Sequence, residues 1–295
     1  MRSDEPGASG QCADIYRAAS RRAPNIRGLN GAIRSGAHVP ASRTLAMRLI
    51  VTRPEPDDDR TARALIRLGH EAILSPMLDV VIEAKAKIPA RPYQAVLATS
   101  SNAVRALAGR AVRPVSVEVP LLAVGDHTAL EAKRSGFSAA RSAGGALDDL
   151  VALVGAELSP AAGPLLYAAG EEQAGDLAGL LRGQGFEVET AILYRTEPRA
   201  RLAKVAEAAL KDGTADGLLL YSRRSAAAFA LAVRAGDLAP LAKTVTCFCL
   251  SAACAEPLAK VTEGNIRVAE RPDQLALFAL IEAEERARSL KPGSE

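Results

Sequence analysis

The chain contains an internal repeat of about 120 residues, and this repeat restricts the folds that the sequence can adopt. The apolar run 95–100 recurs at 217–222, an offset of 122 residues between its last positions, 100 and 222. Three further pairs keep a similar spacing: Asp148-Asp149-Leu150 with Asp273-Gln274-Leu275, 120–125 with 245–251, and 68–72 with 184–188. This period is far longer than the repeat of a solenoid, so it predicts two paired domains. A cleft between two like domains is a frequent place for a ligand.

Short apolar runs alternate with stretches rich in Ala, Leu, Arg and Glu, which predicts an α/β protein. Residues 57–68 are expected to form a helix closed by Gly69. The apolarity of the short runs is continuous and does not alternate, so we expect strands that are covered on both faces, as in parallel sheets. The predicted strands are 48–52, 72–74, 94–98, 121–124, 165–167, 218–221, 246–250 and 266–268.

Two segments interrupt this alternation and are predicted to connect the domains. Residues 79–82 lie in a stretch that contains several prolines, and residues 191–197 carry an apolar run ending in Tyr194. If these segments pair, the chain leaves one domain, builds the second and returns. We therefore expect two doubly wound parallel-sheet domains of related fold joined by a two-stranded β connector. Their predicted bounds are 47–78 with 198–290 for the first domain and 83–190 for the second.

Residues 1–46 form a segment of different composition. They carry seven Arg and three acidic residues, have no sustained apolar period and end before Met47. Such composition is typical of an organelle transit peptide, but it equally fits a disordered leader or a start of translation at Met47. We expect a disordered leader. Because the segment lacks the apolar core of a secretory signal, we expect a cytoplasmic protein.

The composition of residues 47–295 argues against several classes of binding partner. They hold 30 basic and 31 acidic residues, so the net charge of +3 comes from the leader. The chain has no Trp and only 3% aromatic residues, which leaves little for stacking on bases. No apolar stretch is long enough to span a membrane. We expect no nucleic-acid partner, no membrane partner and a monomer.

The sequence gives no support for a metal or redox cofactor. Three of the four cysteines, Cys247, Cys249 and Cys254, lie close together, but Cys12 is distant and no His is near. The spacing of a zinc site is absent, so we expect these three to be small buried apolar residues in a reduced compartment. The phosphate-binding loop, the dinucleotide fingerprint and the nucleophile elbow are also absent.

Hydroxyl and glycine residues follow most of the predicted strands, where a helix is expected to begin. In a parallel sheet these positions line the edge at which ligands bind. Hydroxyls and helix N-terminal N–H groups suit anions such as carboxylates, although each such residue could equally be only a helix cap. The positions expected to line a cleft are Thr52, Arg53, Thr99, Ser100, Ser101, Asn102, Gly125, Thr128, Gly170, Ser222 and Ser251.

Residues 47–290 resemble the uroporphyrinogen-III synthase family. The resemblance is carried by the order and spacing of weak motifs. These are Val51-Thr52-Arg53-Pro54, the run 97–104, the run 123–129, Gly185-Phe186-Glu187-Val188 and Leu193-Tyr194-Arg195-Thr196. It implies two α/β domains joined by a two-stranded ladder. It also implies the substrate hydroxymethylbilane, a linear tetrapyrrole with eight carboxylate arms, and no cofactor.

The family's reaction implies a role for Tyr194. Loss of the substrate's hydroxyl group as water gives an azafulvene, which the far ring attacks at its substituted carbon. The spiro intermediate then fragments and recloses with that ring inverted. Tyr194 matches the tyrosine of the second connector and is a candidate proton donor for the departing hydroxyl; a role in packing alone is the alternative. Thr128 matches a threonine that would bind or orient the substrate. The other cleft-lining positions are implied to bind substrate.

The chain departs from the family pattern at two positions. Ser251-Ala252-Ala253-Cys254 stands where relatives often carry more hydroxyls, and Glu171-Glu172 places two carboxylates next to Gly170. Two other functions remain open. One is a non-catalytic two-domain module that binds a small anion, and the other is a nucleotide-dependent α/β enzyme.

Overall fold

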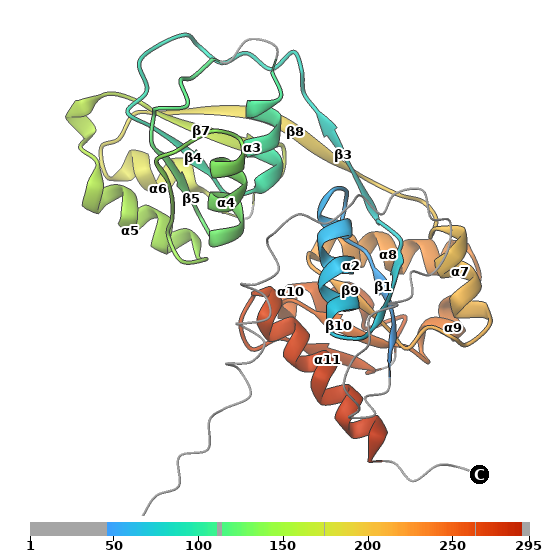
Figure 1. The fold of residues 1–295 in the computed structure, drawn as a ribbon. Helices are drawn as coiled ribbons and strands as arrows, with labels where there is room; N and C mark the ends of the chain where they lie inside the picture. Colours follow the sequence, from blue (N-terminus) through green and yellow to red (C-terminus); the bar gives the residue numbers. More distant parts are fainter. Residues whose placement is uncertain (1–45, 111–113, 174, 263, 291–295) are drawn as a thin grey trace, which may run out of the picture. The chain divides into compact units, whose positions relative to one another are not determined.

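The computed structural model describes residues 46–110, 114–173, 175–262 and 264–290. The predicted leader, with Cys12, lies outside these residues except for Ala46. The described chain divides into two compact units (Figure 1). The first unit contains the residues up to Asp79 and those from Pro198 onward, and the second unit is Val80–Glu197.

The first unit contains a parallel sheet with strand order β11-β10-β9-β1-β2. The order of these strands along the chain is β1, β2, β9, β10, β11. The chain therefore adds β2 on one side of β1 and the later strands on the other side. The sheet is doubly wound, and its strand order reverses between β1 and β9. The strands are β1 (Arg48–Val51), β2 (Glu71–Leu74), β9 (Gly217–Leu220), β10 (Thr246–Cys249) and β11 (Ile266–Val268). The helices are α2 (Asp57–Arg67), α7 (Lys204–Lys211), α8 (Arg223–Ala235), α9 (Ala239–Ala242), α10 (Ala252–Ala255), η2 (Glu256–Leu258) and α11 (Gln274–Ser289).

Both faces of this sheet are buried, which explains the continuous apolarity of its strands. Along β9, Leu218 and Leu220 contact the core beneath α7 and α8, whereas Leu219 between them contacts the core beneath α2 and α11. Along β10, Cys247 and Cys249 lie on the first of these faces and Phe248 lies on the second. The prediction of strands covered on both faces is therefore confirmed for this unit.

The cysteines of this unit lie in its core. Cys247, Cys249 and Cys254 are buried and form no disulfide. Burial raises the pKa of the Cys247 thiol to about 12 and raises that of Cys249 as well, because a thiolate would lose its hydration there. The Cys247 and Cys249 thiols therefore stay protonated, and all three buried cysteines act as small apolar groups, as the sequence predicts.

The second unit contains a mixed sheet with strand order β3-β8-β7-β4-β5-β6. All pairs from β8 to β6 are parallel. Its direction of growth reverses between β4 and β7. The strands are β3 (Leu78–Ile82), β4 (Ala95–Ala98), β5 (Leu121–Ala123), β6 (Ala140–Ser142), β7 (Leu165–Gly170) and β8 (Val188–Pro198). The helices are α3 (Ser101–Ala108), α4 (Asp126–Arg134), α5 (Leu147–Glu157), η1 (Pro160–Ala162) and α6 (Leu177–Gly183).

The helices of the second unit cover opposite faces of this sheet. One buried cluster joins Val96 and Ala98 of β4 to apolar residues of α3 and α4. The other joins Ala95 and Leu97 of the same strand to α5 and α6. The strand order and the two covered faces make this unit a doubly wound α/β structure as well.

Strand β3 pairs with β8 and runs antiparallel to it. The Glu83 amide donates to the Leu193 carbonyl at 2.8 Å, and the Arg199 amide donates to the Met77 carbonyl at 2.9 Å. Because one strand's residue numbers rise as the other's fall, the two strands run in opposite directions. The chain passes from the first unit to the second at residues 79–80 and returns at residues 197–198.

Three details of the second unit differ from the sequence-based prediction. The predicted connector 191–197 belongs to one long strand, β8, whose residues up to Tyr194 already pair with β7. Strand β6 is short and was not predicted. Gly170 ends a strand but does not precede a helix directly, because α6 begins only at Leu177, with Asp176 as its N-cap.

The internal repeat corresponds to equivalent elements in the two units. The runs 95–100 and 217–222 form β4 and β9, and each strand leads to a helix capped by a serine, Ser100 or Ser222. Gly69 and Gly185, another repeated pair, follow helices α2 and α6 with φ angles of +91° and +90°. Residues other than glycine rarely adopt this left-handed conformation, so these glycines end the helices.

The buried residue His70 predicts a dependence of stability on pH. It is 3% exposed, and its Nδ1 accepts a hydrogen bond from the Met47 amide at 3.4 Å. Burial lowers the pKa of His70, and nearby Glu282 and Asp216 only partly oppose this effect. The unfolded chain therefore takes up a proton below about pH 6.5 before the folded chain does, and stability falls as the pH falls.

We expect urea unfolding to show this loss between pH 7 and pH 5, with a contribution from His70 of at most about 1.4 kcal/mol per pH unit. The variant His70→Gln should show a smaller slope over this range. Wild-type and variant slopes should coincide above pH 7.5, which serves as the control. Equal slopes below pH 6.5 would contradict the assignment.

Candidate functional site

The candidate site residues lie at two sheet edges, one in each unit. In a doubly wound sheet, ligands bind at the carboxyl ends of the strands where the strand order reverses. This point falls between β1 and β9 in the first unit and between β4 and β7 in the second.

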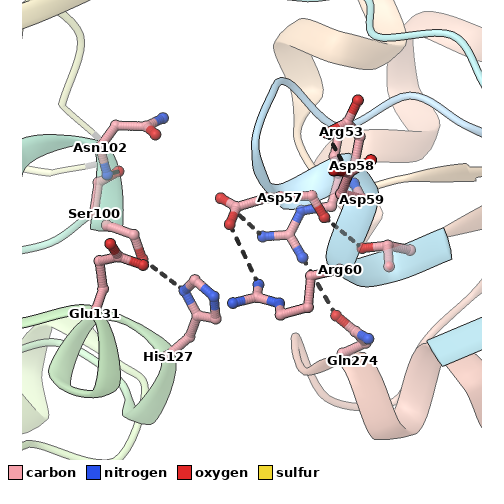
Figure 2. A network of polar contacts seen from close by, with 12 residues as sticks. Arg53, Asp57, Asp58, Asp59, Arg60, Ser100, Asn102, His127, Glu131 and Gln274 are labelled. Atoms are coloured by element: carbon pink, nitrogen blue, oxygen red, sulfur yellow. Dashed lines mark hydrogen bonds and ion pairs between the residues drawn. The ribbon is translucent and has the colours of Figure 1, made fainter. Parts of the chain in front are cut away.

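In the first unit, Arg53 follows β1 and is held by several neighbours. Its guanidinium carbon lies 4.3 Å from the centre of the Tyr221 ring, a cation–π contact. Its Nη2 lies 3.7 Å from Asp57 Oδ2, and its Nη1 donates to Gln274 Oε1 at 3.3 Å. Figure 2 shows the guanidinium groups of Arg53 and Arg60 both directed at Asp57, with Gln274 on the far side of Arg53. The edge thus presents an oriented cation whose charge is partly balanced.

The phenol of Tyr221 lies beneath this cation. Burial raises the pKa of Tyr221, with Arg53 opposing the change. The phenol hydroxyl therefore keeps its proton at neutral pH, and the aromatic ring serves as a flat support for the guanidinium. Asp57 is also near Arg60, at 3.6 Å, so one carboxylate sits between two arginines at the start of α2.

The hydroxyl residues of this edge make bonds inside their own unit. Thr52 is fully buried, and its hydroxyl donates to the Leu219 carbonyl at 2.6 Å. Ser222 accepts from the Ser225 amide at 3.1 Å, so it caps α8. Ser251 lies 3.4 Å from the Cys254 sulfur and precedes a helix of only four residues. Thr52 uses its proton within the fold, and the Ser222 hydroxyl also lies 3.0 Å from the Ser225 hydroxyl, where either oxygen can donate.

In the second unit, side chains of α3 and α4 form a polar network at the helix N-termini. Ser101 Oγ lies 2.6 Å from His127 Nδ1. One turn further along both helices, Arg105 Nη2 donates to Glu131 Oε2 at 3.2 Å, and Arg105 Nη1 donates to Asn102 Oδ1 at 2.8 Å. Figure 2 shows His127, Glu131 and Asn102 from these helices. These contacts fix the two helix starts side by side.

The same two helix starts carry further predicted residues. Ser100 accepts from the Asn102 amide at 3.1 Å and caps α3. Gly125 occupies the N-cap position of α4 and has no side chain to cap it. Thr128 lies in the first turn of α4 and is buried, with 6% exposure. Amide groups at the first turn of a helix attract anions, and both helices begin at the reversal edge or next to it.

On β7, Tyr167 is linked to Thr99, which follows β4. The Tyr167 hydroxyl and Thr99 Oγ1 are 3.1 Å apart. Burial raises the pKa of Tyr167, and the hydrogen bond to Thr99 opposes this change. The pair spans the point at which the strand order reverses, so Thr99 is oriented by a neighbour within the sheet.

Tyr194 lies against Gly170 at the end of β7. A Cβ atom added to Gly170 would be 2.6 Å from Tyr194 Cζ. Beside these residues, a surface cavity of about 390 Å³ is lined by Glu83, Lys85, Ala86, Glu171, Ile192 and Arg195. Glu171 is exposed to solvent, and the Arg195 guanidinium pairs with Glu83 and Glu197. Positive and negative groups are therefore mixed at this cavity.

Several residues at the two edges were not predicted to be functional. They are Asp57, Arg60, His127, Tyr167, Tyr221 and Gln274. His127 lies inside the motif 125–128, and Tyr221 lies at the end of a predicted strand. Their positions in the sequence could therefore have indicated that both lie at the candidate site. Gln274 is far from Arg53 in sequence, and only the fold brings them together.

The described part of the chain offers no cluster of three or more His, Cys, Asp or Glu residues that could hold a metal ion. Within the same residues, no helix is both long enough and apolar enough to cross a membrane.

The fold and its edges define a class of protein: a doubly wound α/β protein with hydroxyl groups and helix N-termini at the carboxyl ends of its strands. Residues 59–279 match the sequence model of the family described as uroporphyrinogen-III synthase HemD. This match covers most of the chain. The chain belongs to the uroporphyrinogen-III synthase family.

Solved structures similar to this chain include two from different bacteria. The uroporphyrinogen-III synthetase of Helicobacter pylori 26695 is 15% identical, with a TM-score of 0.52 over 81% of this chain and 99% of that chain. A mutant uroporphyrinogen III synthase of the extremely thermophilic bacterium Thermus thermophilus is 19% identical, with a TM-score of 0.48 over 83% of this chain and 99% of that chain. The likeness of fold rests on the first of these. The search of curated proteins finds no match.

Proposed function

We propose that this protein acts as a uroporphyrinogen-III synthase, a cyclising lyase of tetrapyrrole biosynthesis. It converts hydroxymethylbilane to the cyclic tetrapyrrole with loss of water and inversion of the last pyrrole ring. The observation that carries this proposal is the family match over residues 59–279. The product feeds the formation of haem, sirohaem, chlorophyll or cobalamin.

The chemistry of the two edges fits a substrate with eight carboxylate arms. Serine caps and helix N-terminal amides donate hydrogen bonds without carrying a full charge. Arg53 adds one oriented cation, steadied by Tyr221 and Gln274. Each edge can bind carboxylates in defined places, and a substrate chain held in one curled shape closes in one way.

Tyr194 is our candidate for the group that protonates the departing hydroxyl. The hydroxyl leaves as water when it takes up this proton, and the resulting azafulvene is attacked by the far ring. A tyrosine is protonated at neutral pH in the absence of a strong perturbation. The position of its ring over Gly170, where the strand order reverses, supports this role. No cofactor takes part in the proposed steps.

The other residues are assigned to binding and orientation. Thr128 orients the substrate from the first turn of α4. The remaining assigned residues are Arg53, Thr99, Ser100, Ser101, Asn102, Gly125, Gly170, Ser222 and Ser251. Thr52 is assigned to the same edge, and its bond to the Leu219 carbonyl supports a role in shaping that edge.

We further propose that the two compact units are domains of related fold and that β3 and β8 are the connector between them. The antiparallel pairing of these strands and the positions at which the chain changes unit support this assignment. Two narrow connections restrain domains only weakly, so a closing motion is expected. We propose a monomer that works in the cytoplasm.

A product assay tests the function. Hydroxymethylbilane cyclises without an enzyme to the isomer in which no ring is inverted, called type I. With the purified protein, chromatography of the oxidised products should show type III as the main isomer. Heat-denatured protein provides the control. Type I alone in the presence of folded protein would reject the synthase and would favour the non-catalytic anion-binding module.

The variant Tyr194→Phe tests the proton donor. Removing the hydroxyl should lower kcat by about 10²-fold or more, the usual contribution of general acid catalysis. Thermal unfolding should stay close to that of the wild type, because the ring is retained. The rate of type III formation at saturating substrate is the measurement. An unchanged kcat would assign Tyr194 to packing alone.

A further inference from the structure

Gly170 and Tyr194 approach each other so closely that a side chain at position 170 would meet the Tyr194 ring. A Cβ atom added to Gly170 would lie 2.6 Å from Tyr194 Cζ and 2.8 Å from its hydroxyl oxygen. Gly170 is not among the glycines with a positive φ angle in the described chain. An alanine could therefore adopt this backbone conformation, and the obstacle to its methyl group is the Tyr194 ring.

An irregularity in β8 places the Tyr194 ring on its face of the sheet. Pairing between β7 and β8 is regular up to Ala169 with Ile192, and the next pair is Gly170 with Tyr194. The strand therefore carries one extra residue, Leu193, as in a β-bulge. In a regular strand, Tyr194 would lie on the same face as Ile192, because successive side chains alternate.

The hydrophobic clusters confirm this change of face. Ile192 packs against the cluster covered by α5 and α6. Leu193 and Tyr194, although adjacent, both pack against the cluster covered by α3 and α4. The bulge thus turns the Tyr194 ring toward the face whose helices carry Ser101 and Thr128.

We propose that Gly170 is a positioning residue for Tyr194. The missing side chain and the bulge together hold the phenol at the carboxyl end of β7, on the face of α3 and α4. The inference rests on the proposed function and deepens it, because it gives Gly170 a role through Tyr194 in place of direct binding of substrate. The Glu171 amide donates to the Tyr194 carbonyl at 2.8 Å, so the backbones are tied together and a side chain at position 170 must displace the ring.

A double-mutant cycle on stability tests the contact itself. In the wild-type background, Gly170→Ala should lower the melting temperature, because the new methyl group collides with the ring. In the Tyr194→Ala background, the same change should leave the melting temperature unchanged or raise it, since alanine is less flexible than glycine in the unfolded chain. Gly183→Ala is the matched control, because a Cβ atom there meets nothing within 4 Å. An equal loss in both backgrounds would overturn the proposed contact.

A second cycle, on turnover, tests the positioning role. Gly170→Ala should lower kcat to a similar extent as Tyr194→Phe, on the order of 10²-fold, with a much smaller change in KM. The double variant Gly170→Ala with Tyr194→Phe should be no slower than Tyr194→Phe alone, because the displaced ring no longer carries the hydroxyl.

The outcomes of the second cycle separate this inference from the proposed function. Losses that multiply in the double variant would mean that Gly170 acts independently of Tyr194, and this would overturn the inference. Gly170→Ala with normal kcat and normal type III product would also overturn it, while the synthase activity would stand. Wild-type protein that forms only type I would reject the proposed function itself.

Discussion

Parallel strands in a doubly wound sheet all end at the same edge, and the placement of the candidate site depends on this constraint. In the first unit the edge brings together Arg53 and Tyr221, which are far apart in sequence. In the second unit it brings together Thr99 and Tyr167, and it sets Tyr194 against Gly170. The helices that follow the strands then begin at the same edge. Short polar side chains and free amide groups gather there as a result of topology.

Basic side chains at these edges lie close to acidic ones. Arg53 and Arg60 share Asp57, and Arg105 faces Glu131, so carboxylates partly offset the charge of these three arginines. Most remaining donors are hydroxyl and amide groups without net charge. Neutral donors favour the orientation of a polyanion over its strong attraction, which suits an enzyme that must release a product carrying the same carboxylates. The reaction of the family needs control of shape more than it needs a reactive cofactor.

The sequence predicts the α/β class and most strands because buried parallel strands read as continuous apolar runs, as at 218–220 and 246–249. Ser100 and Ser222 could be predicted as residues at helix starts because caps depend on local sequence. The inward bond of Thr52 and the stacking of Arg53 on Tyr221 depend on partners distant in sequence, which local patterns do not identify. The bulge at Leu193 is likewise invisible in the sequence, because one extra residue in a strand leaves no mark on its apolar pattern.

The central claim is that oriented and largely neutral donors hold the polyanionic substrate. Its most direct test is the dependence of kcat/KM for hydroxymethylbilane on ionic strength. Binding through neutral donors predicts a shallow dependence, a change of about threefold or less between 0.02 M and 0.5 M sodium chloride, because salt screens net charges far more than hydrogen bonds to uncharged groups. A fall of about a hundredfold or more would show that net positive charge dominates binding, as in sites that neutralise many phosphates, and would contradict the account.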